Sequence, residues 1–185
     1  MITNLILPLI ILSGIPANAG ELSEPSVPDV VLTVTRETWP IALSAELDIP
    51  ASPEKVWKTL ADYDHLPDFL PKMKTSRMIS RRDHNVVVEQ SSETRFFFFR
   101  KTIAVTLNIL EKPIEEIAFS NLDGNMELFS GKWLLKGSED GKSTQLRYQL
   151  EFKPSFFAPR WIVRHTIERE VAEQLQLISK EAQKR

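Results

Sequence analysis

The chain has 185 residues, which is enough for one domain with a substantial apolar core. Its formal net charge is only −2, so it lacks the basic excess that accompanies nucleic-acid binding. The absence of cysteine excludes disulfides, thiol catalysis and zinc sites built on thiolates.

Residues 1–19 carry no charge and include an apolar run at 5–15. The run is followed by Ala17-Asn18-Ala19, a small-residue site of the kind that ends a secretory signal sequence. The run is shorter than the ~20 apolar residues of a membrane span, and no Lys or Arg precedes it. We therefore predict a signal peptide at residues 1–19, cleaved after Ala19, and a periplasmic or secreted protein. The alternative is that this segment is retained as an anchor.

Residues 20–39 are predicted to form a linker. They are polar and contain prolines at first, and they become β-like at 30–34, where a short edge strand can form. Nothing in the composition divides residues 40–185, so we assign them to a single domain. That domain opens with an alternation of apolar and polar side chains at 41–49, which predicts a half-buried strand.

Two short helices are predicted after this strand. Ser52 is a favourable N-cap and Pro53 a favourable first residue of the first helix, whose apolar face includes Trp57. The second helix is a compact turn at 65–71 that ends at Pro71.

From Lys72 onward the hydrophobic period changes to two, which predicts about six antiparallel strands. The segments 126–136 and 143–152 form the last predicted hairpin. The stretch 155–184 then carries the apolar stripe of one long helix. This stripe consists of Ile167, Val171, Leu175, Ile178 and Ala182, at spacings of four, four, three and four.

A stripe this long needs a long apolar surface to cover it, and the strands are the elements that can supply one. We therefore predict an α+β fold in which a sheet packs on the C-terminal helix.

Three motifs in combination resemble the START-like, or helix-grip, superfamily, which includes polyketide cyclases/dehydrases and lipid-transfer domains. Residues 49–57 resemble its opening strand-to-helix passage, and residues 62–71 resemble its second-helix signature. Phe129, Gly131 and Trp133 lie in a segment that resembles a pattern of the coenzyme-Q-binding branch.

The resemblance covers residues 41–182. It implies a strongly curved antiparallel sheet wrapped around the C-terminal helix, with two short helices after the first strand and an apolar cavity between sheet and helix. Members bind lipids, quinones, polyketides, hormones or other proteins, so the fold alone does not decide the function. A secretory start departs from the intracellular members and argues against a role at ribosomes or at the inner face of the respiratory chain.

Inward-facing apolar side chains are the candidate lining of this cavity, since such pockets are mostly apolar with few polar anchors. The alternative is that the same side chains fill a core. The candidate ligand-binding residues are Trp57, Phe69, Phe119, Phe129, Trp133, Tyr148, Trp161, Ile167 and Val171.

No catalytic residue, metal site or cofactor is predicted. His65, His84 and His165 lack the spacing of metal ligands on a helix face, and the six glycines form no phosphate-binding loop. A nucleophile elbow of the form Gly-x-Ser-x-Gly does not occur.

The function that these features favour is non-enzymatic binding or transport of a hydrophobic small molecule, such as a lipid, an isoprenoid or a quinone. One alternative is a cyclase/dehydrase-type enzyme, which would need an acid or base with a shifted pKa inside the cavity. Another is a protein-interaction module, which would have a filled core instead of a cavity.

Phe96, Phe97, Phe98 and Phe99 are consecutive and stand between Arg95 and Arg100. Four consecutive rings cannot all face one side of a strand, so one pair should face the helix and the other should face outward. The outward pair is either covered by residues 30–34 or exposed beside the cations. Exposed aromatics flanked by cations suit an anionic membrane surface, which makes transient membrane contact a hypothesis.

Overall fold

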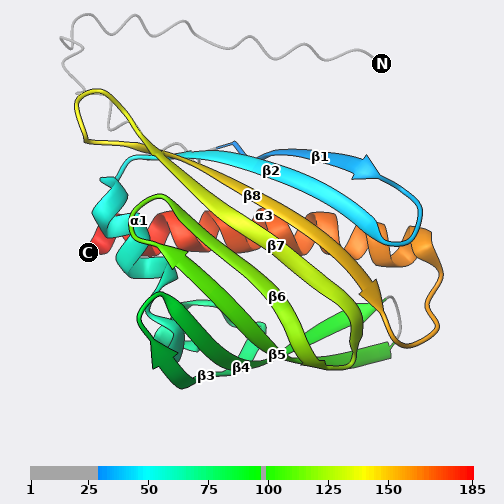
Figure 1. Cartoon of the computed structure of the whole chain (residues 1–185). Helices are drawn as coiled ribbons and strands as arrows, with labels where there is room; N and C mark the ends of the chain where they lie inside the picture. The colour runs from blue at the N-terminus through cyan, green and yellow to red at the C-terminus, as the bar shows by residue number, and fades with distance from the viewer. Residues whose placement is uncertain (1–28, 97–98) are drawn as a thin grey trace, which may run out of the picture.

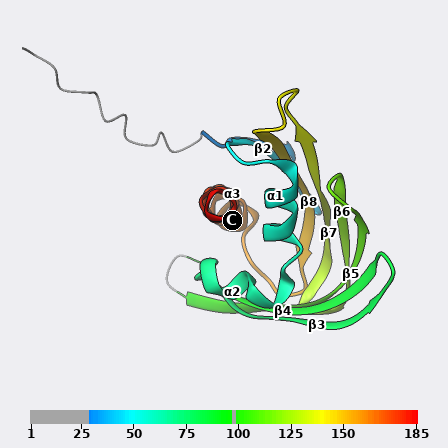
Figure 2. The same cartoon turned by 90° about the vertical axis from the view of Figure 1, so that its left-hand side faces the viewer.

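The computed structural model describes residues 29–96 and 99–185. Within them, eight antiparallel strands form one sheet in the order β1-β2-β8-β7-β6-β5-β4-β3, which curves around the C-terminal helix α3 (Figures 1 and 2). The elements in chain order are β1 (Val31–Arg36), β2 (Ile41–Ile49), α1 (Pro53–Leu60), the single 3₁₀ turn η1 (Tyr63–His65), α2 (Leu66–Phe69), β3 (Met73–Arg82), β4 (Asn85–Phe96), β5 (Phe99–Lys112), β6 (Glu116–Gly124), β7 (Met126–Gly137), β8 (Thr144–Pro154) and α3 (Arg160–Lys184). The predicted helix-grip fold is confirmed.

The first and last strands of the predicted domain lie next to each other in the sheet. β2 pairs with β8 along its whole length, from Ile41 opposite Phe152 to Ile49 opposite Thr144. Apolar side chains alternate along both strands and are buried on the concave face of the sheet. This pairing brings the start of the domain against the strand that leads into α3.

Helix α3 lies on the concave side of the sheet, with α1 and α2 beside it (Figure 2). It begins at Arg160, directly after Pro159, whose missing N–H costs nothing at a helix start. Of the predicted stripe, Val171, Leu175, Ile178 and Ala182 are buried, and Ile167 is half-buried against the core. The stripe is therefore covered by the sheet, as the helical spacing predicted.

The hairpin of β4 and β5 extends until the backbones of Phe96 and Phe99 pair. The side chains of Phe96, Phe97, Phe98 and Phe99 lie outside the described residues, so the prediction of which rings face outward is not resolved. β1 lies at the opposite edge of the sheet from β3 and β4, with α3 between them in Figure 2. This order contradicts the alternative in which residues 30–34 cover the hairpin.

The predicted signal peptide at residues 1–19 also lies outside the described residues. In the part of the chain that the structure describes, no helix has both the length and the apolar character that a membrane span requires.

Candidate functional site

A cavity of about 230 Å³ lies between the concave face of the sheet and α3. Its walls come from α3, the segment from the end of α1 to the start of β3, and strands β4 to β8. Most lining side chains are aromatic or aliphatic, which is typical of a small-molecule pocket.

Four aromatic rings from β6, β7 and β8 form one wall of the cavity. Trp133 and Tyr148 are opposite each other in the β7–β8 pair, and their rings stack with centroids 4.0 Å apart. Phe119 lies 6.2 Å from Tyr148 on one side and 5.5 Å from Phe129 on the other, measured between ring centroids. We call Phe119, Phe129, Trp133 and Tyr148 the aromatic wall. Cross-strand stacking holds these rings in place, so the wall is a rigid apolar surface.

Six of the nine candidate residues lie where the sequence placed them. The cavity is lined by Phe119, Phe129, Trp133, Tyr148, Ile167 and Val171. Whether they bind a ligand remains a prediction.

The other three candidates, Trp57, Phe69 and Trp161, do not line the cavity, so their predicted positions are corrected. Val56 and Leu60 lie on the buried face of α1. Trp57 is one residue further along the helix, which turns its side chain away from that face and leaves it half-buried.

Phe69 and Trp161 are displaced by the same helical geometry. Leu66 and Leu70, one turn apart, point into the cavity, whereas Phe69 packs near the C-terminal end of α3. Trp161 stands two residues before the buried Val163, which is about half a turn, and is 67% exposed.

One ionisable group inside the cavity, Glu170 on α3, was not among the residues predicted from the sequence. Its side chain is only 13% exposed, and its Oε2 accepts a hydrogen bond of 3.1 Å from the Thr94 hydroxyl on β4. Its Oε1 has no hydrogen-bond partner among the described residues, although Lys72 Nζ lies 3.7 Å away. Burial raises the pKa of the Glu170 carboxyl, against the opposing effect of the Lys72 ammonium. One signal was available, since Glu170 follows Ile167 by three residues and therefore lies on the inner face.

Two tyrosines of the lining have different surroundings. The Tyr63 hydroxyl donates to Glu111 Oε1 at 2.8 Å, and Arg81 donates to both oxygens of the same buried carboxylate at 2.6 and 3.1 Å. Glu111 is therefore saturated and has a structural role. The Tyr148 side chain lines the cavity, and burial raises the pKa of its phenol, so the phenol is a neutral group.

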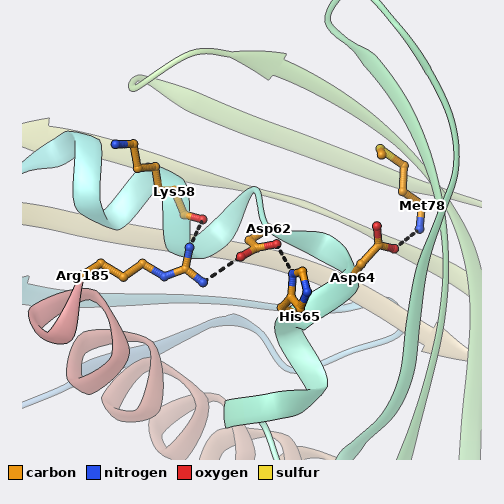
Figure 3. A network of polar contacts seen from close by, with 6 residues as sticks. All are labelled: Lys58, Asp62, Asp64, His65, Met78 and Arg185. Atoms are coloured by element: carbon orange, nitrogen blue, oxygen red, sulfur yellow. Dashed lines mark hydrogen bonds and ion pairs between the residues drawn. The ribbon is translucent and has the colours of Figure 1, made fainter.

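A polar network outside the cavity joins the chain's C-terminal residue to the turn after α1 (Figure 3). Asp62 contacts His65 Nδ1 at 2.6 Å and accepts from Arg185 at 2.8 Å, while Asp64 accepts from the Met78 backbone N–H at 2.7 Å. Hydrogen bonding to Asp62 raises the pKa of His65. These groups cap backbone ends and pair with each other, so they are structural contacts.

No group of His, Asp or Glu side chains within residues 29–96 and 99–185 is arranged to hold a metal ion.

The fold and the cavity define this chain as a helix-grip protein of the hydrophobic-ligand-binding type. The sequence model of one protein family, described as "Polyketide cyclase / dehydrase and lipid transport", matches residues 49–177. The chain therefore belongs to that family, and the START-like resemblance is confirmed at this level.

Solved structures with the same fold have low sequence identity to this chain. The Zhui aromatase/cyclase from Streptomyces sp. R1128 is 19% identical over 78% of this chain and 94% of its own, with a TM-score of 0.67. Human STARD10 is 13% identical over 84% of this chain and 69% of its own, with a TM-score of 0.68. A STAR-related lipid transfer protein from Xanthomonas axonopodis is 13% identical over 86% of this chain and 96% of its own, with a TM-score of 0.64.

At these identities the similarity establishes the fold alone. No curated protein sequence matches this chain.

Proposed function

We propose that this protein binds and carries a hydrophobic small molecule in the cavity between the sheet and α3, without covalent chemistry. The observation that supports this function best is the cavity itself, which the aromatic wall and the apolar residues of α3 line. An apolar ligand would gain about 25 cal/mol for each Å² removed from water, which is enough to drive binding. A filled core would have favoured the protein-interaction alternative instead.

The ligand class that fits this lining is a lipid, an isoprenoid or a quinone. Flat or extended apolar groups can lie against the stacked rings of Trp133 and Tyr148. A quinone remains a candidate because Phe129, Gly131 and Trp133 resemble the coenzyme-Q-binding pattern. Structurally similar proteins include a lipid transfer protein and an aromatase/cyclase, so they support this class without choosing within it.

Native mass spectrometry of the purified protein, followed by organic extraction, tests the proposal. A carrier is expected to retain an apolar molecule that is released on denaturation. Purified protein that neither retains such a molecule nor takes up Nile red, a lipophilic fluorophore, would contradict it.

A second candidate function, a cyclase/dehydrase-type enzyme, is favoured by Glu170. A carboxyl with a raised pKa inside an apolar cavity can act as a general acid or base. Returning the extracted molecule to ligand-free protein distinguishes the two functions. A carrier returns a molecule of unchanged mass, whereas an enzyme changes its mass or its isomeric form, and Glu170→Gln stops the change.

We also propose that the carrier is exported and touches a membrane to load its ligand. Export rests on residues 1–19, and the expected mature chain begins at Gly20. Intact mass of protein from the periplasmic fraction tests it, and a product that keeps residues 1–19 would contradict cleavage.

The proposed membrane contact has support near the end of the β4–β5 hairpin. Phe157, in the connection from β8 to α3, is 94% exposed, and Trp161, in the first turn of α3, is 67% exposed. Figure 1 shows this connection at the end of β8. Lys101 Nζ lies 4.8 Å from the centre of the Phe156 ring, which joins β5 to this connection. Arg160 is exposed between the two aromatic residues. Exposed rings among cations suit an anionic bilayer, so this surface joins Phe96–Phe99 as a candidate for membrane contact.

A further inference from the structure

The polar side chains of the cavity gather where β4 faces α3, away from the aromatic wall on β6, β7 and β8. Gln90, Ser92 and Thr94 alternate along β4 and all face the cavity. Glu170 faces them from α3, and Thr94 is hydrogen-bonded to it. The cavity therefore has one polar side and one apolar side, as a site for an amphipathic molecule would.

One acceptor on the polar side is free. The Thr94 hydroxyl donates a hydrogen bond to Glu170 Oε2, but Oε1 is buried and has no hydrogen-bond partner among the described residues. A buried carboxylate oxygen without a donor is unfavourable, so a ligand that brings a donor gains from filling this position.

We propose that Glu170 Oε1 accepts a hydrogen bond from a hydroxyl group of the ligand, so that the ligand is an uncharged lipid alcohol whose apolar body lies against the aromatic wall. This inference rests on the proposed function, since it specifies the ligand of the same cavity.

The charges around Glu170 favour a neutral donor over a charged one. An ammonium group at this position would meet the like charge of Lys72, whose Nζ lies 3.7 Å from Oε1 and also pairs with Glu173, and it would lose its hydration in the apolar cavity. A ligand carboxylate would instead face the carboxylates of Glu170 and Glu173. A hydroxyl group meets neither repulsion and supplies the missing donor.

Isothermal titration calorimetry with four decyl compounds tests this recognition. Decanol is expected to bind wild type about tenfold more tightly than decyl methyl ether, which has the same apolar body but no donor, because a hydrogen bond to a charged acceptor is among the stronger kinds. Decanoic acid and decylamine should bind more weakly than decanol. Equal affinity for decanol and its ether, or tightest binding of decanoic acid, would overturn the proposal.

Two variants test whether Glu170 causes the preference for decanol over its ether. Glu170→Met should retain the affinity for decyl methyl ether and lose the preference for decanol. Glu168→Met, the same change at a half-buried position of α3 that does not line the cavity, should keep the preference. A Glu170→Met protein that still prefers decanol would overturn the assignment.

Two further outcomes keep the proposals separate. If Glu170→Met does not fold, Thr94→Val removes the bond that orients the carboxylate and should reduce the preference several-fold; an unreduced preference then counts against the assignment. If none of the four compounds binds wild type, the proposed carrier function fails, whereas equal binding of decanol and its ether contradicts only the role of Glu170.

Discussion

The ring of Phe119 lies over the backbone of Gly131, its partner in the β6–β7 pair, in the space that a side chain at position 131 would occupy. A Cβ atom on Gly131 would lie 2.8 Å from Cζ of Phe119 and 2.1 Å from the carbonyl oxygen of Gln149 on β8. Only glycine at position 131 therefore lets the Phe119 ring pack against β7 between Phe129 and Trp133.

Gly131→Ala should consequently destabilise the protein. The added methyl group must displace either the Phe119 ring or the β8 backbone, and overpacking of this kind costs about 1–3 kcal/mol of unfolding free energy. Urea denaturation followed by circular dichroism measures the loss. Ser130→Ala, at the next residue and on the other face of β7, is the control and should be close to neutral. Equal urea midpoints for Gly131→Ala and Ser130→Ala would show that the position of the Phe119 ring does not require glycine at residue 131.

The long helix provides a second prediction. Leu175 is 0% exposed beneath the sheet, so Leu175→Asp would bury a carboxylate without a partner. That costs several kcal/mol, out of the ~5–15 kcal/mol that stabilise a typical domain. Val171→Asp should have a similar effect. Glu173→Ala, which removes only a surface ion pair with Lys72, should change the melting temperature little. Similar melting temperatures for all three variants would mean that the sheet does not cover this helix.

The pattern of apolar residues predicted an α+β arrangement of a sheet on a helix and the residues of the aromatic wall, whereas the curvature of the sheet and the cavity were predicted from the family resemblance. Strand alternation placed Phe119, Phe129, Trp133 and Tyr148 on the concave face, and helical spacing identified the stripe of α3. These are local periodicities, which survive in any tertiary arrangement that covers the apolar face.

Predictions failed where the exact rotation of a helix decides the outcome. Trp161 differs by half a turn from Val163, and an aromatic residue near a helix start cannot be assigned inward without knowing that rotation. The group around Glu170 could not be found from sequence either, because Lys72, Thr94 and Glu170 come from three elements that meet only in the folded sheet and helix.

Trp133→Ala tests whether the aromatic wall binds a ligand or only fills space. If the wall lines a working cavity, the variant should lose Nile red binding more than it loses stability. If Trp133 is instead an ordinary core residue, Trp133→Ala should lower the unfolding free energy by ~3–5 kcal/mol. Trp161→Ala is a matched control, because Trp161 lies outside the cavity. This variant should change neither the affinity for Nile red nor the unfolding free energy. A large loss of stability with unchanged dye affinity in Trp133→Ala would identify Trp133 as core.

The contact between Asp62 and His65 predicts a modest dependence of stability on pH. Asp62 raises the pKa of His65, so the contribution of the histidine is present below its ordinary pKa of about 6.5 and is lost as pH rises through the raised value. Burial opposes ionisation of Asp62, but hydrogen bonds from His65 and Arg185 outweigh it and lower the Asp62 pKa. Its contribution is therefore present above pH ~3.9 and is lost as pH falls.

The pair should thus stabilise the fold mainly between pH ~4 and ~6.5, and only slightly, because His65 is largely exposed to solvent. His65→Ala should lower stability within this window and have less effect above it. Proton NMR titration measures the pKa of His65 directly, and Asp62→Asn should bring it back towards its ordinary value. An unchanged His65 pKa in Asp62→Asn would rule out this cause.

The exposed aromatics beside α3 provide the last prediction. Phe157 and Trp161 present large rings to solvent next to Arg160, and rings of this kind enter the membrane interface while cations meet anionic headgroups. Wild type should therefore sediment with phosphatidylglycerol vesicles at low salt and release them as salt screens the cations. Phe157→Ser/Trp161→Ser should reduce the bound fraction several-fold, whereas Ile79→Ser, which removes an exposed apolar side chain from the edge strand β3, should not. Phe97→Ser/Phe99→Ser and Phe96→Ser/Phe98→Ser, compared in the same assay, show which pair of the hairpin contributes. If folded wild type stays in the supernatant with anionic vesicles at low salt, membrane contact is excluded, and the carrier must load its ligand from solution or from another protein.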